Sequence, residues 1–573
     1  MKLGRSTVPK LVLTILLLEL MAGLIWGGVW ALSSIWRKTV QIEPFTDNTD
    51  GSLAKFLQQS VEMTLRAAQQ INRQADLSAI SPASSFEIPF LKPESSTLKK
   101  IQELDIKVRD VSLNTFLKTM ELFRHPTYVV TANTLSDKLS LAAAMELTGG
   151  SDASTSIVVS VPRTADLEAD KLKLANEVGY RLLYEIAQRF KDKDTVASAG
   201  SWRSLEVYTE GLKALQDYRN ATRFGDSIGN KPPQDYLDVA IAKFEDVDRI
   251  DPSFDYGTYY LAISYFEGRN KEKQAIEFLK RLLAKDPAPS MMLEARFYLG
   301  YSYFRTYDTA GYEAAVKVYD KLVKDLEQAL ETGENAEERV KLIGLLAESY
   351  AQLATTHAHM VAPDPPGSDT PEGKAKELQQ KEEHHREFVN KSRKTEDILS
   401  MHGKDLTQEL RNDIAWRREN ARGIAASRLA FFERANTDEY TRHKNEALDQ
   451  YKKALSYSPR NFSILENLGS TLGDPKYHDH SFKQAERFFL EAIQLKPNDD
   501  YAYSELARLY LAWEHESGNS TERTKYHQLA IDAFAKAAKL EDTERPYSRN
   551  KLVEMSSNGD QQAEKALKRA RIR

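Results

Sequence analysis

The feature that most constrains this chain is a residue spacing that recurs six times after residue 239. In each copy a small residue is followed four positions later by an aromatic residue or leucine, and seven positions later by another apolar residue. Residues at these spacings share one face of an α-helix. The copies begin at Ala240, Ala275, Ala315, Ala447, Ala485 and Ala530, and four of them are followed by Pro252, Pro287, Pro459 and Pro497. Because proline cannot continue a helix, the pattern predicts a series of similar helices with defined ends.

A second helical pattern lies upstream of five of these copies and carries its own small residue. Its versions are Leu261-Ala262-Tyr265, Leu299-Gly300-Tyr303, Leu468-Gly469-Leu472, Leu506-Ala507-Tyr510 and a poorer Tyr208-Leu212. Small residues let two helices cross closely, and an aromatic ring fills the space between them. These paired patterns resemble the tetratricopeptide repeat family, whose unit is a pair of helices in about 34 residues. The resemblance implies an all-α solenoid that binds a protein or peptide.

The family's register also implies which residues would line a partner-binding groove. These are Tyr256, Tyr259, Ile263, Phe266, Phe297, Tyr301, Phe304 and Arg305. A groove rich in aromatic side chains suits an extended peptide or an amphipathic helix, and Arg305 would face a carboxylate. The alternative is that these aromatic residues pack against the chain's own middle region or its α/β domain.

We expect repeats in residues 201–330 and again in 436–573, where a polar capping helix ends the chain. The region between them, 331–435, contains three helical stretches at 338–360, 374–399 and 406–434. A loop rich in proline and glycine separates the first two of these stretches. The sequence leaves open whether this divergent region forms irregular helix pairs or an inserted hairpin.

The N-terminal part begins with a basic flank, 1–10, and an apolar run, 11–36, whose single charged residue is Glu19. A run of this length predicts a transmembrane helix, and the alternative is a cleaved signal peptide. The basic flank favours a cytoplasmic N-terminus, with the bulk of the chain periplasmic in a single-pass protein of bacterial type. Gly23 and Gly27 form a G-x-x-x-G pair that would allow helix dimerisation, and hence a homodimer.

Residues 38–198 read as a mixture of strands and helices, which predicts a small α/β domain. A strand with a Pro-Phe exit, "VQIEPF", precedes a long helical pattern, and further strands and helices follow. Over residues 38–195 this order is similar to the TolB N-terminal and CsgG-like domains. That resemblance implies no catalytic residue.

A search for catalytic chemistry finds no convincing constellation. The stretch "GSDTPEGKA" misses the spacing and the Ser/Thr of a phosphate-binding loop. The histidines at 357, 359, 384 and 385 do not match a standard metal-ligand spacing. A net charge of -5 gives no reason to expect a nucleic-acid partner. We therefore expect no catalytic residue, metal or cofactor, and not an enzyme.

Taken together, the sequence predicts a multi-domain α+β protein with an N-terminal transmembrane helix, a small α/β domain and a C-terminal all-α tetratricopeptide solenoid. The predicted function is that of a membrane-anchored scaffold for protein–protein interaction. The alternative is an envelope ligand sensor or divergent enzyme whose activity lies in the α/β domain, with the repeats serving assembly.

Overall fold

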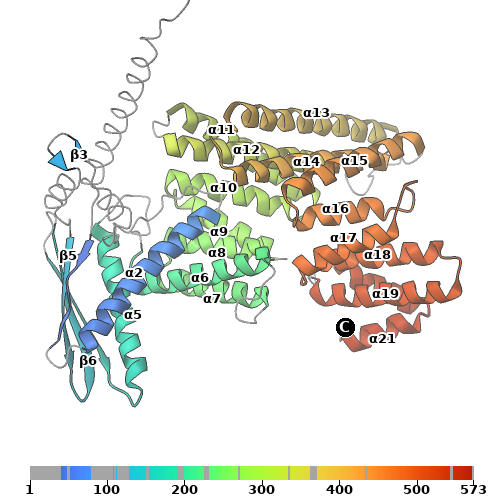
Figure 1. The fold of residues 1–573 in the computed structure, drawn as a ribbon. Helices are drawn as coiled ribbons and strands as arrows, with labels where there is room; N and C mark the ends of the chain where they lie inside the picture. Colours follow the sequence, from blue (N-terminus) through green and yellow to red (C-terminus); the bar gives the residue numbers. More distant parts are fainter. Residues whose placement is uncertain are drawn as a thin grey trace, which may run out of the picture. The chain divides into compact units, whose positions relative to one another are not determined.

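The structure is a computed structural model (Figure 1), and the ranges it describes have gaps between them. They are 40–47, 52–78, 107–108, 111–112, 128–149, 154–189, 199–224, 232–268, 271–332, 336–361, 371–432, 437–541 and 546–570. The chain forms two compact units, and the boundary between them falls at Glu206 and Val207. Each unit is described below by itself.

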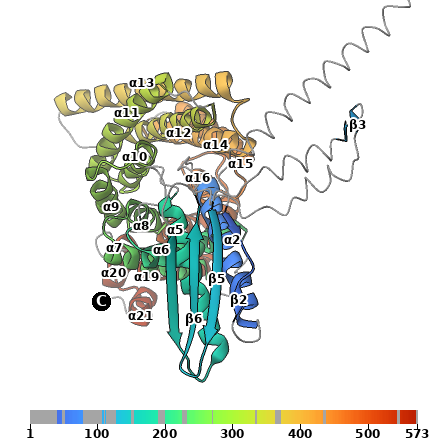
Figure 2. The ribbon, with the colours of Figure 1, turned by 90° about the vertical axis from the view of Figure 1, so that its left-hand side faces the viewer.

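The first unit is built on a small sheet (Figure 2). Its three long strands, β5 (Tyr128–Ser136), β6 (Ser140–Thr148) and β7 (Thr155–Pro162), are antiparallel neighbours, while β1 (Val40–Ile42) and β2 (Thr46–Asp47) pair in parallel with β5. Alternate side chains of the long strands are buried, as expected of a sheet covered on one face. The helices α2 (Ser52–Ser78) and α5 (Leu167–Arg189) cross where a Cβ atom on Gly179 would lie 3.0 Å from Thr64.

The predicted fold class was wrong in its proportions, because most described residues of the chain are helical. The two short strands β3 (Lys107–Val108) and β4 (Val111–Ser112) pair with each other outside the main sheet. The sheet is small because its three long strands all come from residues 128–162, where apolar and polar residues alternate.

The predicted transmembrane helix and the single-pass localisation based on it are also corrected. Of the helices in the described ranges, none combines the length and the apolar character needed to cross a bilayer. The reason is amphipathicity: even α13 (Pro371–His402), with 32 residues, carries charged residues along its length. The run 11–36, with Glu19, Gly23 and Gly27, lies outside the described residues.

The second unit is a series of helices that pack on their neighbours along the chain (Figure 1). In order they are α6 (Trp202–Phe224), α7 (Pro233–Ile250), α8 (Asp255–Glu267), α9 (Glu272–Ala284), α10 (Pro289–Phe304), α11 (Thr309–Thr332), α12 (Ala336–Met360), α13, α14 (Gln408–Phe432), α15 (Thr437–Tyr457), α16 (Phe462–Leu472), α17 (Phe482–Leu495), α18 (Asp500–Glu516), α19 (Ser520–Leu540), α20 (Tyr547–Ser557) and α21 (Gln561–Ala570). Local chemistry fixes several helix starts: the Asp499 carboxylate accepts from the backbone N–H of Tyr501 and Ala502 at the start of α18.

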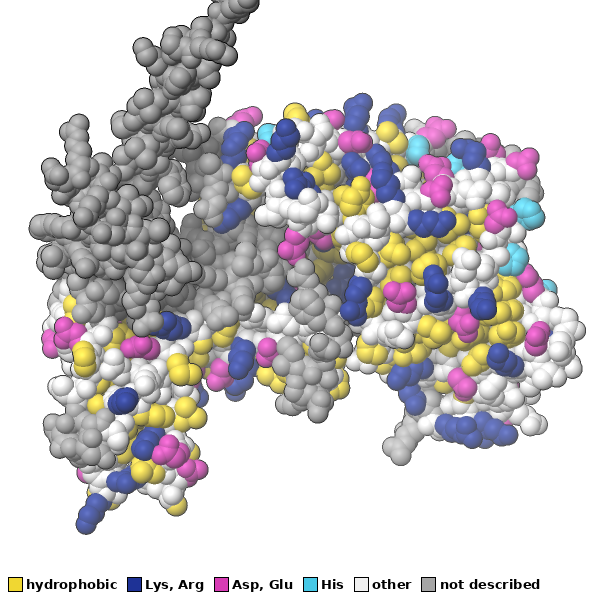
Figure 3. All heavy atoms as spheres, viewed as in Figure 1, with side chains coloured by type: hydrophobic (Ala, Val, Ile, Leu, Met, Phe, Trp, Pro, Cys, Tyr) yellow, Lys and Arg dark blue, Asp and Glu magenta, His cyan; other side chains and the backbone are white. Residues whose placement is uncertain are grey.

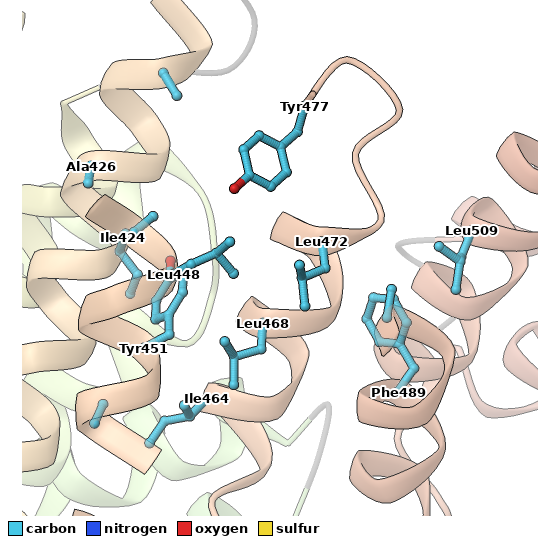
Figure 4. Packing of buried hydrophobic residues seen from close by; sticks show 14 of the residues in the cluster. Ile424, Ala426, Leu448, Tyr451, Ile464, Leu468, Leu472, Tyr477, Phe489 and Leu509 are labelled. Atoms are coloured by element: carbon cyan, nitrogen blue, oxygen red, sulfur yellow. The ribbon is translucent and has the colours of Figure 1, made fainter. Parts of the chain in front are cut away.

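The predicted close crossing of paired helices is confirmed at the glycines. A Cβ atom on Gly300 would lie 2.8 Å from the Tyr319 ring, and one on Gly469 would lie 2.8 Å from the Phe489 ring. The aromatic residue of the second helix therefore occupies the space that the missing side chain leaves. Figure 4 shows Phe489 in this packing, where it belongs to the same buried cluster as Leu468 and Leu472. The unit is thus a solenoid of repeated helix pairs.

One such crossing lies in the region that the sequence left undecided. A Cβ atom on Gly423 of α14 would lie 2.4 Å from the Tyr451 ring of α15. Tyr451 is buried in the core between these helices. The last helix of the 331–435 region thus forms a regular pair with the helix that carries Ala447.

We expect Gly423→Ala to lower the free energy of unfolding by about 1–3 kcal/mol, because the added methyl group overpacks a buried ring. Urea unfolding of the purified chain measures this effect. Gly518→Ala is the matched control, since a Cβ atom at Gly518 would meet nothing within 4 Å. Equal effects of the two substitutions would contradict the close crossing.

Candidate functional site

The first helix of each pair contributes to one continuous layer of the solenoid, which we call the first-helix layer: α8, α10, α12, α14, α16, α18 and α20. The residues that the sequence placed in a partner groove all lie on α8 and α10 or directly after α10. Six of them are buried, namely Tyr256, Tyr259, Ile263, Phe266, Phe297 and Phe304, whereas Tyr301 and Arg305 are half-buried. The structure therefore brings the predicted residues together but covers most of their surface.

The buried rings contact one another from helix to helix. The ring centroids of Tyr259 and Tyr298 lie 6.3 Å apart, and those of Phe266 and Tyr301 lie 5.0 Å apart. Phe304 reaches the middle region, where its ring lies 5.1 Å from that of His359 on α12. Part of the predicted groove thus packs on the chain's own middle helices, and its role in binding a partner stays a prediction.

Arg305 is engaged with the preceding helix pair. Its guanidinium lies 3.1 Å from the Glu272 carboxylate and donates to the backbone carbonyls of Phe266 and Gly268. The same group lies 4.9 Å from the centroid of the Phe266 ring. These contacts tie the end of α10 to the turn between α8 and α9.

A partly buried ionic cluster that the sequence did not reveal joins α12 and α14. Arg417 donates from Nε and Nη2 to Oδ2 of Asp413 at 3.1 and 3.0 Å, and Trp416 donates to Oδ1 at 2.6 Å. A second carboxyl group, that of the fully buried Glu348, lies 3.9 Å from Nε of Arg417. Arg417 also lies 5.9 Å from the ring centroid of Tyr301 on α10. The cluster therefore links three successive first helices.

Burial decides the protonation of this cluster. It raises the pKa of Glu348 well above 4.5, and the neighbouring Asp413 carboxylate raises it further, against the pull of Arg417. Burial acts on Asp413 in the same direction, but Arg417 and the donors around Asp413 lower its pKa overall. The Asp413 carboxylate thus pairs with the Arg417 guanidinium, while Glu348 favours its neutral form.

Polar side chains also bond directly between successive first helices. Tyr259 Oη donates to Oε2 of Glu294 at 2.7 Å between α8 and α10. Farther along the chain, Asn467 Nδ2 donates to Oδ1 of Asn420 at 3.0 Å, and the hydroxyl groups of Ser504 and Ser548 lie 2.6 Å apart. These contacts join side chains 35 to 47 residues apart, and the Tyr259–Glu294 and Ser504–Ser548 pairs are buried.

Exposed aromatic and cationic groups of the layer lie on α18 and α20. Tyr501 is 47% exposed, Tyr547 is 45% exposed, and the Arg508 side chain is 58% exposed. Arg508 donates to Glu505 at 2.8 Å, and the Glu505 carboxylate raises the pKa of both Arg508 and Tyr501. Tyr501 therefore stays a neutral phenol that can donate a hydrogen bond. The family register, extended to α18, would have found Tyr501 and Arg508.

The four histidines of the middle region come together only in part. His357 and His384 face each other with their Nδ1 atoms 3.2 Å apart, and burial lowers the pKa of His357 to about 4. His359 is half-buried and packs against Phe304 of α10, whereas His385 lies beside Phe388. Within the described ranges, no three His, Asp or Glu side chains are grouped closely enough to hold a metal ion.

Comparison with known proteins adds little to this geometry. No model of a known protein family matches the sequence, and no curated protein matches it. Among solved structures, a monomeric mutant of IFIT1 with Gppp-AAAA is 15% identical and covers 70% of this chain and 74% of its own, with a TM-score of 0.31. The TPR2AB domain of yeast Sti1 with pHSP90 is 15% identical and covers 64% of this chain and 98% of its own, with a TM-score of 0.16. Likeness at this level carries no inference about function.

Proposed function

We propose that this protein is a noncatalytic binding scaffold that holds an extended segment of another protein along its first-helix layer. The observation that carries the proposal is the polar contact made between successive first helices. Stacked helix pairs form one surface along successive repeats, and a backbone in extended conformation can follow such a surface. Binding of this kind needs no covalent chemistry.

The Asn420–Asn467 pair is suited to a peptide backbone. Each side-chain amide offers two N–H donors and a carbonyl with two acceptor sites. The bond between the two residues uses one donor of Asn467 and one acceptor site of Asn420. The capacity left over is the mixed donor and acceptor set that a peptide group pairs with.

The exposed groups of α18 would add anchors for side chains. Tyr501 offers a ring and a hydroxyl group, and Arg508 offers a planar guanidinium, the residue types that dominate binding energy at interfaces. Of the groove residues predicted from the sequence, Tyr301 is the half-buried ring best placed to extend the same surface, because it lies on the same layer beside Arg417.

The test is to select linear peptides that bind the full chain by phage display and to remeasure their affinity for variants. We expect Tyr501→Ala combined with Arg508→Ala to raise the Kd about thirtyfold or more, as the loss of a hot spot does. Because both side chains are exposed, the free energy of unfolding should change by less than about 1 kcal/mol.

The control is Arg487→Ala combined with Leu490→Ala, a pair of exposed side chains on the second helix α17. This variant should bind the selected peptides as the wild type does. Failure to select any linear peptide would refute an extended partner. Equal loss in both double variants would place the site outside the first-helix layer.

A further inference from the structure

A histidine near the end of the solenoid is held between two carboxylates from different helices. Nδ1 of His527 on α19 lies 3.0 Å from Oε2 of Glu514, in the last turn of α18. Nε2 of the same ring lies 2.6 Å from Oδ2 of Asp560, in the turn before α21. One imidazole therefore connects α18, α19 and the turn between α20 and α21.

This arrangement requires the charged form of the ring. A neutral imidazole has a single N–H donor, whereas the imidazolium has two and can donate to both carboxylates at once. Burial opposes the charge, but the hydrogen bonds and charges of Glu514 and Asp560 outweigh it and raise the pKa of His527 above 6.5. Asp560 in turn has a lowered pKa and stays ionised.

Several other charged groups on α19 and the elements packed around it are engaged elsewhere. Among them are Glu516 with His480, Glu554 with Lys551, Glu564 with Lys568, Asp532 with Gln528, and Arg523 with the carbonyl of Ser517. The charge of His527 is thus set by Glu514 and Asp560.

Asp560 also starts α21. Its Oδ1 atom accepts from the backbone N–H of Gln562 at 2.8 Å and of Ala563 at 3.1 Å. The carboxylate that holds His527 is therefore the one that caps the last helix, so the two contacts are coupled through a single side chain.

The helix α21 is a cover for the apolar end of the solenoid. Its Ala563 and Leu567 belong to or pack on a cluster with Ile531 and Phe534 of α19. Its outer side carries Lys and Arg side chains, which gather over α21 in Figure 3. Beside the His527 contact lies an open surface hollow of about 590 Å³, lined by Ser520, Thr521, Thr524, Lys525, Gln528 and Gln562.

We propose that His527 is a pH-operated latch that holds α21 on the end of the solenoid. While the imidazolium bridges Glu514 and Asp560, the cover is closed. When the proton is lost, one carboxylate faces a nitrogen lone pair, and α21 opens locally and exposes the apolar surface of α19.

The direction of the pH effect follows from the raised pKa of His527. Because the folded state binds this proton more tightly than the unfolded state, the stabilisation is fully present below about pH 6.5. It is lost as the pH rises through the higher pKa of the folded state. The latch is therefore closed at a pH below the folded-state pKa of His527 and open at a pH above it.

Amide hydrogen exchange of the full chain, expressed as protection factors for residues 561–570, tests the proposal. Between pH 6 and pH 9 we expect wild-type protection of this segment to fall about tenfold, the equivalent of one hydrogen bond to a charged group. In His527→Gln, protection should be low at pH 6 and should not change with pH. The control His515→Gln replaces an exposed histidine of α18 and should follow the wild type.

Asp560→Ser provides a second variant, because serine can still cap α21 but cannot pair with the imidazolium. The protection of residues 561–570 in Asp560→Ser should match that in His527→Gln. If His527→Gln does not fold, Asp560→Ser alone tests the latch. Constant wild-type protection between pH 6 and pH 9 would overturn the latch. So would a wild-type pH profile in either latch variant.

Discussion

Arg417→Met is expected to lower the free energy of unfolding of the helical unit by about 1.5–3 kcal/mol, the contribution of hydrogen bonds to a charged group. Arg417 is the residue that neutralises Asp413, and its substitution leaves that carboxylate, whose side chain is 35% exposed, without its cationic partner. Because methionine keeps much of the volume of the arginine side chain, the loss of unfolding free energy measures the removal of the charge and not the opening of a cavity. Urea unfolding measured at pH 7 gives the difference.

Glu348→Gln is the matched comparison in the same cluster, and it should not lower the free energy of unfolding at pH 8. Because burial raises the pKa of Glu348 above 4.5, the wild type is most stabilised by this group below pH 4.5, and that contribution is lost as the pH rises through the folded-state pKa. Glutamine keeps the shape of the neutral acid. The variant should therefore unfold at the same or higher urea concentration than the wild type at pH 8, with a flatter pH dependence.

These two outcomes separate the roles of the two acids. If Arg417→Met were as stable as the wild type, the cluster would contribute no net pairing energy. If Glu348→Gln instead lost stability at pH 8, Glu348 would be ionised and would share the guanidinium with Asp413.

The sequence predicted the helix pairs well because their signal is local. A small residue and a ring four positions later mark the contact face of a helix. A following proline marks the end of the same helix. The α14–α15 pair escaped notice because Gly423 follows Arg422 and precedes Ile424, without the leucine and aromatic residue that mark the other first helices. Only the approach of Tyr451 identifies it.

The candidate site was harder to predict, because exposure depends on contacts between helices far apart in the sequence. The repeat register placed Tyr259 and Phe304 on the right helices, yet Tyr298 and His359 cover them. Helical periodicity also treats a charged residue as exposed, so it cannot find an ionic cluster such as the one around Arg417. The small α/β domain was overestimated for a related reason: short apolar runs do not show whether they pair in one sheet.

Phe489→Ala is the second substitution with a large expected effect, about 3–5 kcal/mol of unfolding free energy. The ring is 1% exposed and lies over Gly469, which has no side chain to fill the space that its removal would open. Phe488→Ala is the control, since that half-buried neighbour leaves the glycine crossing intact and should cost less than half as much.

Each helix pair of a solenoid contacts only its neighbours. The loss of stability caused by Phe489→Ala should therefore be largest in its own pair and decrease with distance along the solenoid. Amide exchange should show reduced protection in α16 and α17, a smaller change in α15 and α18, and little change in α8 to α11. Uniform loss of protection through the whole unit would mean that the pairs fold as one cooperative block. That result would also require the α21 cover to open only with the rest of the solenoid, so the same measurement bears on the latch at His527.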